Sequence, residues 1–228
     1  MPRRPRALAT FASLAAVLAV GLAVSTGADA KRRTDCERAG SRTRIETGQL
    51  RVYDVVVRAR RKPTSTSTYA CRKGSTRPPI LLLDDRGNDD TGIDNLVVLF
   101  DRLTLTSVRC APGVLSCTQR VRLLDLGDRH SRYGEAAPAG GDPAVWQAVR
   151  ALPSLSGAMV YSAQTPVEPT PDRPLVDARI AVVGADGVTH ELDRGPGVEA
   201  DTLAVAQLAD NLSLFTWRSG GVLRAATY

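Results

Sequence analysis

The chain has 228 residues, of which 43% are hydrophobic and 24% charged, and its formal net charge is +6. This length suffices for one domain with a core of its own and excludes a multidomain machine. The charge is unevenly distributed, because residues 31–78 hold 14 basic and 4 acidic residues whereas residues 79–228 hold 13 basic and 19 acidic ones.

The first thirty residues have the three parts of a secretory signal peptide. A tip with three arginines at 1–6 precedes an apolar run at Ala7–Val24, and Ala28–Ala30 is a small-x-small cleavage site. An alanine-rich run of this length, directly after a basic tip, is typical of a signal-peptide helix rather than a permanent membrane span. We therefore expect a protein that is secreted or held in the periplasm or cell wall, with no membrane span after cleavage. This excludes cytoplasmic enzymes.

Two strongly basic segments follow the signal peptide. Residues 31–49 form a basic N-terminal arm. A second basic cluster consists of Arg58, Arg60, Arg61 and Lys62. Clustered cations bind anionic polymers, and an exported protein meets cell-envelope polymers rather than regulatory DNA. Only Tyr53 and Tyr69 lie nearby to stack on bases, so we expect no nucleic-acid partner. The alternative interpretation of both segments is a solvated surface.

Four cysteines in an exported chain favour two disulfides, for which three connectivities are possible. The cysteines are Cys36, Cys71, Cys110 and Cys117. Cys110 and Cys117 flank a turn-rich stretch, so a local bridge between them is geometrically easy, and Cys36 would then tie the N-terminal arm to Cys71. No Cys-x-x-Cys pair occurs and both histidines, His130 and His190, are isolated. We therefore expect neither a zinc site nor a catalytic thiol.

Short runs rich in Val, Leu and Ile predict a single all-β domain over residues 50–228. The predicted strands include Arg51–Val57, Asn95–Phe100, Gln119–Leu126, Ala178–Val183 and Leu203–Leu208. Glycine-containing turns at 185–187 and 219–221 predict two hairpins. The stretch Pro143–Leu152, with Asp142 as a cap, fits a helix and a strand equally well.

A pair of strands recurs four times along the chain. The second strands of these pairs are Thr68–Cys71, Thr106–Arg109, Met159–Ser162 and Leu214–Trp217. Each follows another apolar strand: Leu50–Val57, Asn95–Phe100, Val145–Leu152 and Leu203–Leu208. Small antiparallel sheets repeated at roughly 40–50 residues are typical of propeller blades.

The chain resembles the secreted TolB-like β-propeller repeat proteins of bacteria over residues 50–228. The most similar stretches are Leu203–Val205, Leu212–Trp217 and Gly220–Ala226, and Arg120–Leu126 is similar to the third strand of a blade. The resemblance implies a propeller-like fold, in a family that shares no single active site. Four blades is the lower limit for a closed ring. An incomplete ring and a β-sandwich are therefore the alternatives.

An acidic loop at residues 84–94 holds five carboxylates, one asparagine and two glycines. Calcium prefers such oxygen ligands on a bent loop, and Asn88, Asp90 and Asp94 have an alternate spacing that would let them converge on one ion. The loop does not follow the EF-hand order. The two alternatives are therefore a calcium site and a polar turn that holds no cofactor.

Motifs for hydrolytic catalysis are missing from the sequence. It contains no Gly-x-Ser-x-Gly, Ser-x-x-Lys or His-Glu-x-x-His. Along the strand predicted around His190, Glu191 falls on the opposite face from the histidine. Two catalytic carboxylates that are distant in sequence but close in the fold cannot be recognised from the sequence. Residues 84–94, Asp125 and Asp128 are the candidates for such a pair. We expect a non-catalytic binding or scaffold protein of the bacterial cell envelope, or alternatively a secreted carbohydrate-active enzyme.

Overall fold

The computed structural model describes residue 36 and residues 38–57, 65–85, 91–110, 117–142, 146–165, 177–209 and 211–228, all within one compact unit, Arg33–Tyr228. In these ranges the regular elements are β-strands, which confirms the all-β prediction. They contain no helix with the length and apolarity needed to cross a membrane. The expected signal-peptide helix and the basic cluster Arg58, Arg60, Arg61 and Lys62 lie outside the described residues.

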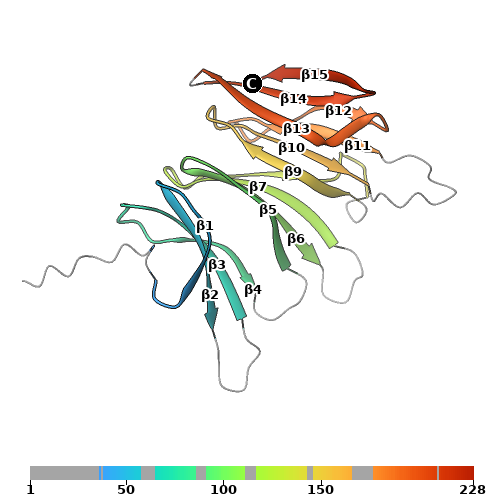
Figure 1. The fold of residues 1–228 in the computed structure, drawn as a ribbon. Helices are drawn as coiled ribbons and strands as arrows, with labels where there is room; N and C mark the ends of the chain where they lie inside the picture. Colours follow the sequence, from blue (N-terminus) through green and yellow to red (C-terminus); the bar gives the residue numbers. More distant parts are fainter. Residues whose placement is uncertain are drawn as a thin grey trace, which may run out of the picture. The chain divides into compact units, whose positions relative to one another are not determined.

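Strands that follow one another along the chain pair in four small antiparallel sheets (Figure 1). Sheet 1 consists of β1 (Ser41–Glu46), β2 (Leu50–Val57), β3 (Ser65–Arg72) and β4 (Ile80–Asp85). Sheet 2 consists of β5 (Thr91–Leu99), β6 (Arg102–Cys110), β7 (Cys117–Asp125) and β8 (Ser131–Glu135). Sheet 3 consists of β9 (Gln147–Pro153), β10 (Met159–Gln164), β11 (Ala178–Val183) and β12 (Thr189–Gly195). Sheet 4 consists of β13 (Val198–Ala209), β14 (Leu212–Ser219) and β15 (Val222–Thr227).

The predicted four-fold repeat of strand pairs is confirmed. The pairs are β2–β3, β5–β6, β9–β10 and β13–β14, one in each sheet. The undecided stretch at 143–152 is a strand from Gln147 onward, because its backbone pairs with β10. Both predicted hairpins also form, between β11 and β12 and between β14 and β15. Gly220 and Gly221 have φ of 60° and 74° in the second turn, a conformation that glycine adopts without strain.

Strand β1 lies within residues 31–49, the stretch that the sequence predicts to be a basic arm. It pairs with β2, and Arg44 Nε donates to both carboxylate oxygens of Asp54, at 2.9 and 2.8 Å. Ile45 packs against the core that sheets 1 and 2 share. The sequence pattern conceals this strand because Ile45 is its only aliphatic residue.

Three of the cores are each built from two sheets that are consecutive in the chain. Sheets 1 and 2 share Leu50, Val52, Ala70, Leu103, Leu105, Leu124 and Leu126. Sheets 2 and 3 share a core that includes Val121, Leu123, Trp146, Met159 and Tyr161. Sheets 3 and 4 share a core that includes Val160, Ile180, Leu203, Phe215 and Trp217. Strand β7 is consequently buried on both faces, since Leu123 and Leu124 point to opposite sides and enter different cores.

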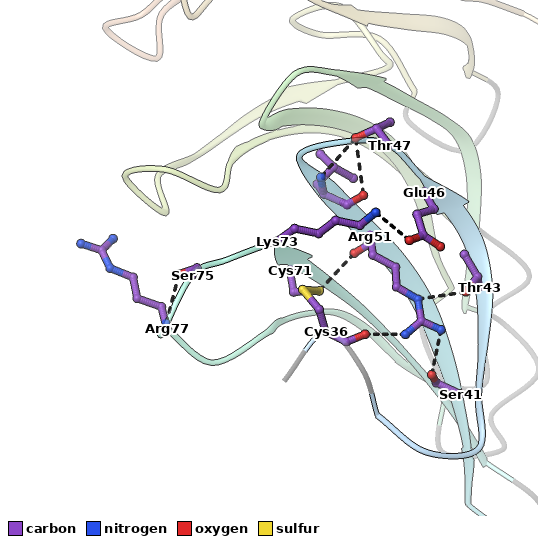
Figure 2. The surroundings of a disulfide bond; sticks show 11 residues. Cys36, Ser41, Thr43, Glu46, Thr47, Arg51, Cys71, Lys73, Ser75 and Arg77 are labelled. Atoms are coloured by element: carbon purple, nitrogen blue, oxygen red, sulfur yellow. Dashed lines mark hydrogen bonds and ion pairs between the residues drawn. A yellow bond between two sulfur atoms is a disulfide. The ribbon is translucent and has the colours of Figure 1, made fainter. Parts of the chain in front are cut away.

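A disulfide joins Cys36, which precedes β1, to Cys71 in β3 (Figure 2). The two Cα atoms lie 5.6 Å apart, so this predicted pairing is confirmed. Arg51 reinforces it: Nη1 donates to the Cys36 carbonyl and Nη2 donates to Ser41 Oγ at 3.0 Å (Figure 2). Cys110 and Cys117 are direct partners in the β6–β7 ladder. Their side chains lie outside the described part, so the second bridge stays a prediction.

Asp125 and Arg102 connect sheets 2 and 3. Arg102 Nε donates to Asp125 Oδ2 at 2.8 Å, and its Nη1 donates to the carbonyls of Ser154 and Leu155 in the turn before β10. Asp125 Oδ1 also accepts the amide of Gly127 at 2.8 Å. Burial alone would raise the pKa of Asp125, but these donors outweigh it and the pKa of this carboxyl is lowered.

We expect Asp125 to make the stability of the fold depend on pH in the acid range. Because its folded-state pKa lies below the unfolded value of about 4, its stabilising contribution is complete above that pH and is lost as the pH falls through the folded pKa. Urea unfolding of Asp125→Asn should therefore show a shallower loss of stability below about pH 4 than the wild type. The exposed Asp94→Asn is the matched control. Parallel pH curves for Asp125→Asn and the wild type would contradict the assignment.

Candidate functional site

A cavity of about 770 Å³ opens between sheets 2 and 3. Side chains of β7 and β8 line it from sheet 2, and side chains of β10, β11 and β12 line it from sheet 3. The segment 137–141 after β8 supplies an apolar wall of alanine, proline and glycine. This volume falls within the range of small-molecule binding sites.

Arg179, the second residue of the otherwise apolar strand β11, is the most buried charge of the cavity. It is 4% exposed, and its Nη2 donates to Tyr161 Oη at 2.7 Å. Tyr161 Oη in turn donates to the carbonyl of Glu135 at 2.9 Å. Burial raises the pKa of Tyr161, although Arg179 opposes the shift, so the phenol stays neutral and able to donate. This chain of hydrogen bonds fixes the orientation of the guanidinium.

The Nε of Arg179 is buried and has no hydrogen-bond partner within the described structure. The nearest anionic group is Glu191 Oε2, at 3.8 Å, which is close enough for an ion pair but too far for a hydrogen bond. A buried donor that lacks an acceptor destabilises a fold by about 1–3 kcal/mol, and by more when it belongs to a charged group. Such a group in a native structure calls for an explanation in the chemistry of its surroundings, and Arg179 lines the cavity.

The rim of the cavity carries further charges and one exposed aromatic ring. Arg120 Nε lies 2.7 Å from Glu135 Oε1, and both side chains are half-exposed. Arg194 lies over the ring of Trp146, with its Cζ 5.6 Å from the ring centroid. Tyr133 is 51% exposed at the mouth. Three arginines and two glutamates thus line the cavity, and Arg194 is also ion-paired at 3.2 Å with Asp177, which lies outside this lining.

The carboxylates of the lining are both close to arginines. Both carboxylates lie against guanidinium groups, Glu135 against Arg120 and Glu191 against Arg179. Among the described residues that line the cavity there is no histidine, cysteine or serine to act as a nucleophile or a proton shuttle.

Of the residues predicted for other sites, the described ones Asp94, Asp125 and Asp128 do not line this cavity. Asp94 is exposed on β5, while Asn88 and Asp90 lie outside the described residues, so the calcium site stays a prediction. In the part of the chain that the structure describes, no three His, Cys, Asp or Glu residues are grouped to hold a metal. Asp125 is bound to Arg102, and Asp128 pairs with the exposed His130 at 3.2 Å.

Arg179 and Glu135 were missed by the sequence analysis, although a signal for one of them is present. A single arginine within the run Ala178–Val183 is unusual for a strand whose every residue is buried. Glu191 was placed on the strand face opposite His190, and that face is the one that lines the cavity.

Gly134 on β8 controls how closely the two sheets approach at this site. A Cβ at position 134 would lie 2.7 Å from Tyr161 Cε1, closer than packed carbon atoms allow. We expect Gly134→Ala to lower the free energy of unfolding by about 1–3 kcal/mol, as overpacking does. Urea denaturation would measure it, with Gly92→Ala in β5 as the control, because a Cβ at position 92 meets no atom within 4 Å. Equal stability of the two variants would contradict the expectation.

Comparison with protein-family models and with curated proteins gives no match to this chain. The resemblance to TolB-like repeat proteins therefore stays an expectation from the sequence. What the cavity binds has to be inferred from its own geometry and charge.

Proposed function

We propose that this protein is an exported, non-catalytic binding protein of the bacterial cell envelope, and that its cavity takes a negatively charged group of an envelope polymer. The observation that carries the proposal is the buried Nε of Arg179, which has no acceptor within the described structure. An anion entering the cavity would supply that acceptor. Charge-assisted hydrogen bonds of this kind are about twice as strong as neutral ones.

The fold supports a scaffold role as well. Four sheets pack pairwise through separate cores, in chain order, and blades of an incomplete propeller ring would pack in this way. A β-sandwich has one core between two sheets, so it fits these cores less well. The disulfide between Cys36 and Cys71 is compatible with an oxidising, extracytoplasmic location.

The proposal is tested by co-sedimentation of the mature protein with a bacterial cell-envelope fraction at low and high salt. We expect binding that weakens as salt rises, because the rim and the basic cluster Arg58, Arg60, Arg61 and Lys62 are screened by ions. Arg179→Gln should lose most of the binding. Arg224→Gln, on the exposed strand β15, is the matched control and should bind like the wild type.

A thermal melt of each variant establishes that it is folded. Binding by folded Arg179→Gln at the level of Arg224→Gln would refute the role of the cavity. No binding by the wild type at low salt would refute the function itself.

A second candidate is a carbohydrate-active enzyme, which one observation favours. Glu135 and Glu191 line the same cavity, and glycoside hydrolysis needs two carboxylates that face one site. An enzyme would release reducing sugar ends from the bound polymer, and Glu191→Gln would abolish the release. We expect no release from either form.

A further inference from the structure

We infer that the cavity binds a sugar acid, that is, a hydroxylated ring that carries one carboxylate, as a unit of the envelope polymer. This inference rests on the proposed function and names the chemical class of its ligand. It is built on the charge of the cavity, the anchored arginine, the two carboxylates and the aromatic rim.

One arginine of the lining lacks a close counter-charge. Arg120 pairs with Glu135 at 2.7 Å and Arg194 pairs with Asp177 at 3.2 Å, whereas Arg179 Nε lies 3.8 Å from Glu191. A ligand with one carboxylate would give Arg179 a close counter-charge. A doubly charged phosphate monoester would leave an excess negative charge in a space where Arg179 is 4% exposed, which is costly in a medium of low dielectric constant.

Arg179 is already oriented to receive a carboxylate. The 2.7 Å bond from Nη2 to Tyr161 Oη, and the bond from Tyr161 to the Glu135 carbonyl, anchor one side of the guanidinium. Its buried Nε–H has no partner within the described structure, and Arg179 is part of the lining of the cavity. A planar guanidinium edge and a planar carboxylate match in geometry, and a group held in place before binding loses little entropy.

The carboxylate of Glu191 indicates that the ligand also has hydroxyl groups. Its Oε2 lies 3.8 Å from Arg179 Nε, so a carboxylate bound to Arg179 would lie near a second negative charge. That proximity is unfavourable unless Glu191 accepts hydrogen bonds from the ligand. Hydroxyls next to the carboxylate, as on a sugar acid, would provide those donors.

The mouth of the cavity suits a ring rather than a flexible chain. Tyr133 exposes half of its surface there, and Pro138 with its neighbouring alanines forms an apolar wall. The C–H face of a pyranose ring can pack against such surfaces, whereas a polyol phosphate chain has no such face. This argument separates a sugar acid from a phosphodiester, which also carries one charge.

The test measures affinities of the mature protein by calorimetry for four defined probes. They are an oligomer of galacturonic acid, the matching neutral galactose oligomer, cyclohexanecarboxylate and a glycerol phosphodiester. We expect the galacturonate oligomer to bind at least about tenfold more tightly than each of the other three, a difference of about 1.4 kcal/mol. Arg179→Gln and Tyr133→Ala should each weaken its binding about tenfold, and Arg224→Gln should leave it unchanged.

Glu191→Gln gives a readout that a structural role would not produce. It should strengthen binding of cyclohexanecarboxylate, because a like charge is removed, and should strengthen binding of the galacturonate oligomer less, because a hydroxyl acceptor is weakened. Equal gains for both probes would overturn the role of the hydroxyls. The exposed ring of Tyr133 keeps the test informative if Arg179→Gln does not fold.

The remaining outcomes separate this inference from the proposed function. Arg179-dependent binding to the envelope fraction, combined with preference for the phosphodiester or the neutral oligomer, would overturn the sugar-acid inference and leave the function standing. Failure to bind both the envelope fraction and all four probes would overturn both.

Discussion

Replacing both Cys36 and Cys71 with serine is expected to lower the free energy of unfolding by about 4 kcal/mol. The bridge spans 35 residues of sequence, and a cross-link over such a loop restricts the unfolded chain strongly. A loss of this size is a large fraction of the 5–15 kcal/mol by which domains are usually stable. A clear fall in the urea midpoint would measure it.

Part of this effect should be local to sheet 1. Tyr53 is fully buried there in a cluster with Cys36 and Cys71. Arg51 holds the segment that begins at Cys36 in place through hydrogen bonds to the Cys36 carbonyl and to the hydroxyls of Ser41 and Thr43. Without the bridge these bonds must hold the segment alone, so we expect Tyr53 to become accessible to solvent.

The variant Arg51→Gln is the control for the disulfide prediction, since it removes the polar contacts and keeps the bridge. Arg51→Gln should lower the free energy of unfolding by less than the double cysteine variant does. If the double variant unfolds at the wild-type urea concentration, the bridge does not contribute to stability.

The sheets could be predicted from the sequence because their strand pairs are local. The runs Leu50–Val57 and Thr68–Cys71 are close in the chain, and the turn residues between strands mark where each hairpin reverses. Packing between sheets could not be predicted in the same way. Leu123 and Leu124 are adjacent in one apolar run, and nothing in the pattern assigns them to two different cores.

The cavity could not be predicted from the sequence for a related reason. Its two glutamates and its buried arginine come from β8, β11 and β12, which belong to two sheets. The alternation of residues along β12 did give the correct face for Glu191, but not what that face meets. The close approach of Gly134 to Tyr161 depends on how the sheets pack, which the sequence pattern does not encode.

Replacing Phe215 with alanine is expected to destabilise the protein by about 3–5 kcal/mol and to act mainly on sheet 4. Phe215 is fully buried in the core that sheets 3 and 4 share, and its ring centroid lies 6.4 Å from that of Tyr228. A cavity left by a phenyl ring removes much of the apolar contact that holds these sheets together. Trp217 Nε1, which donates to Asp193 Oδ2 at 2.7 Å, remains as a polar link.

Hydrogen exchange resolves whether this loss stays local. Because each core is shared by only two consecutive sheets, the sheets should behave like neighbouring repeats, whose stabilities are coupled mainly at their shared interfaces. In Phe215→Ala, amides of β13–β15 should exchange much faster while amides of β2 and β3 keep most of their protection. Thr216→Ala, on the opposite face of β14, is the matched control and should change little. A uniform loss of protection across all four sheets would instead mean that they unfold as one cooperative unit.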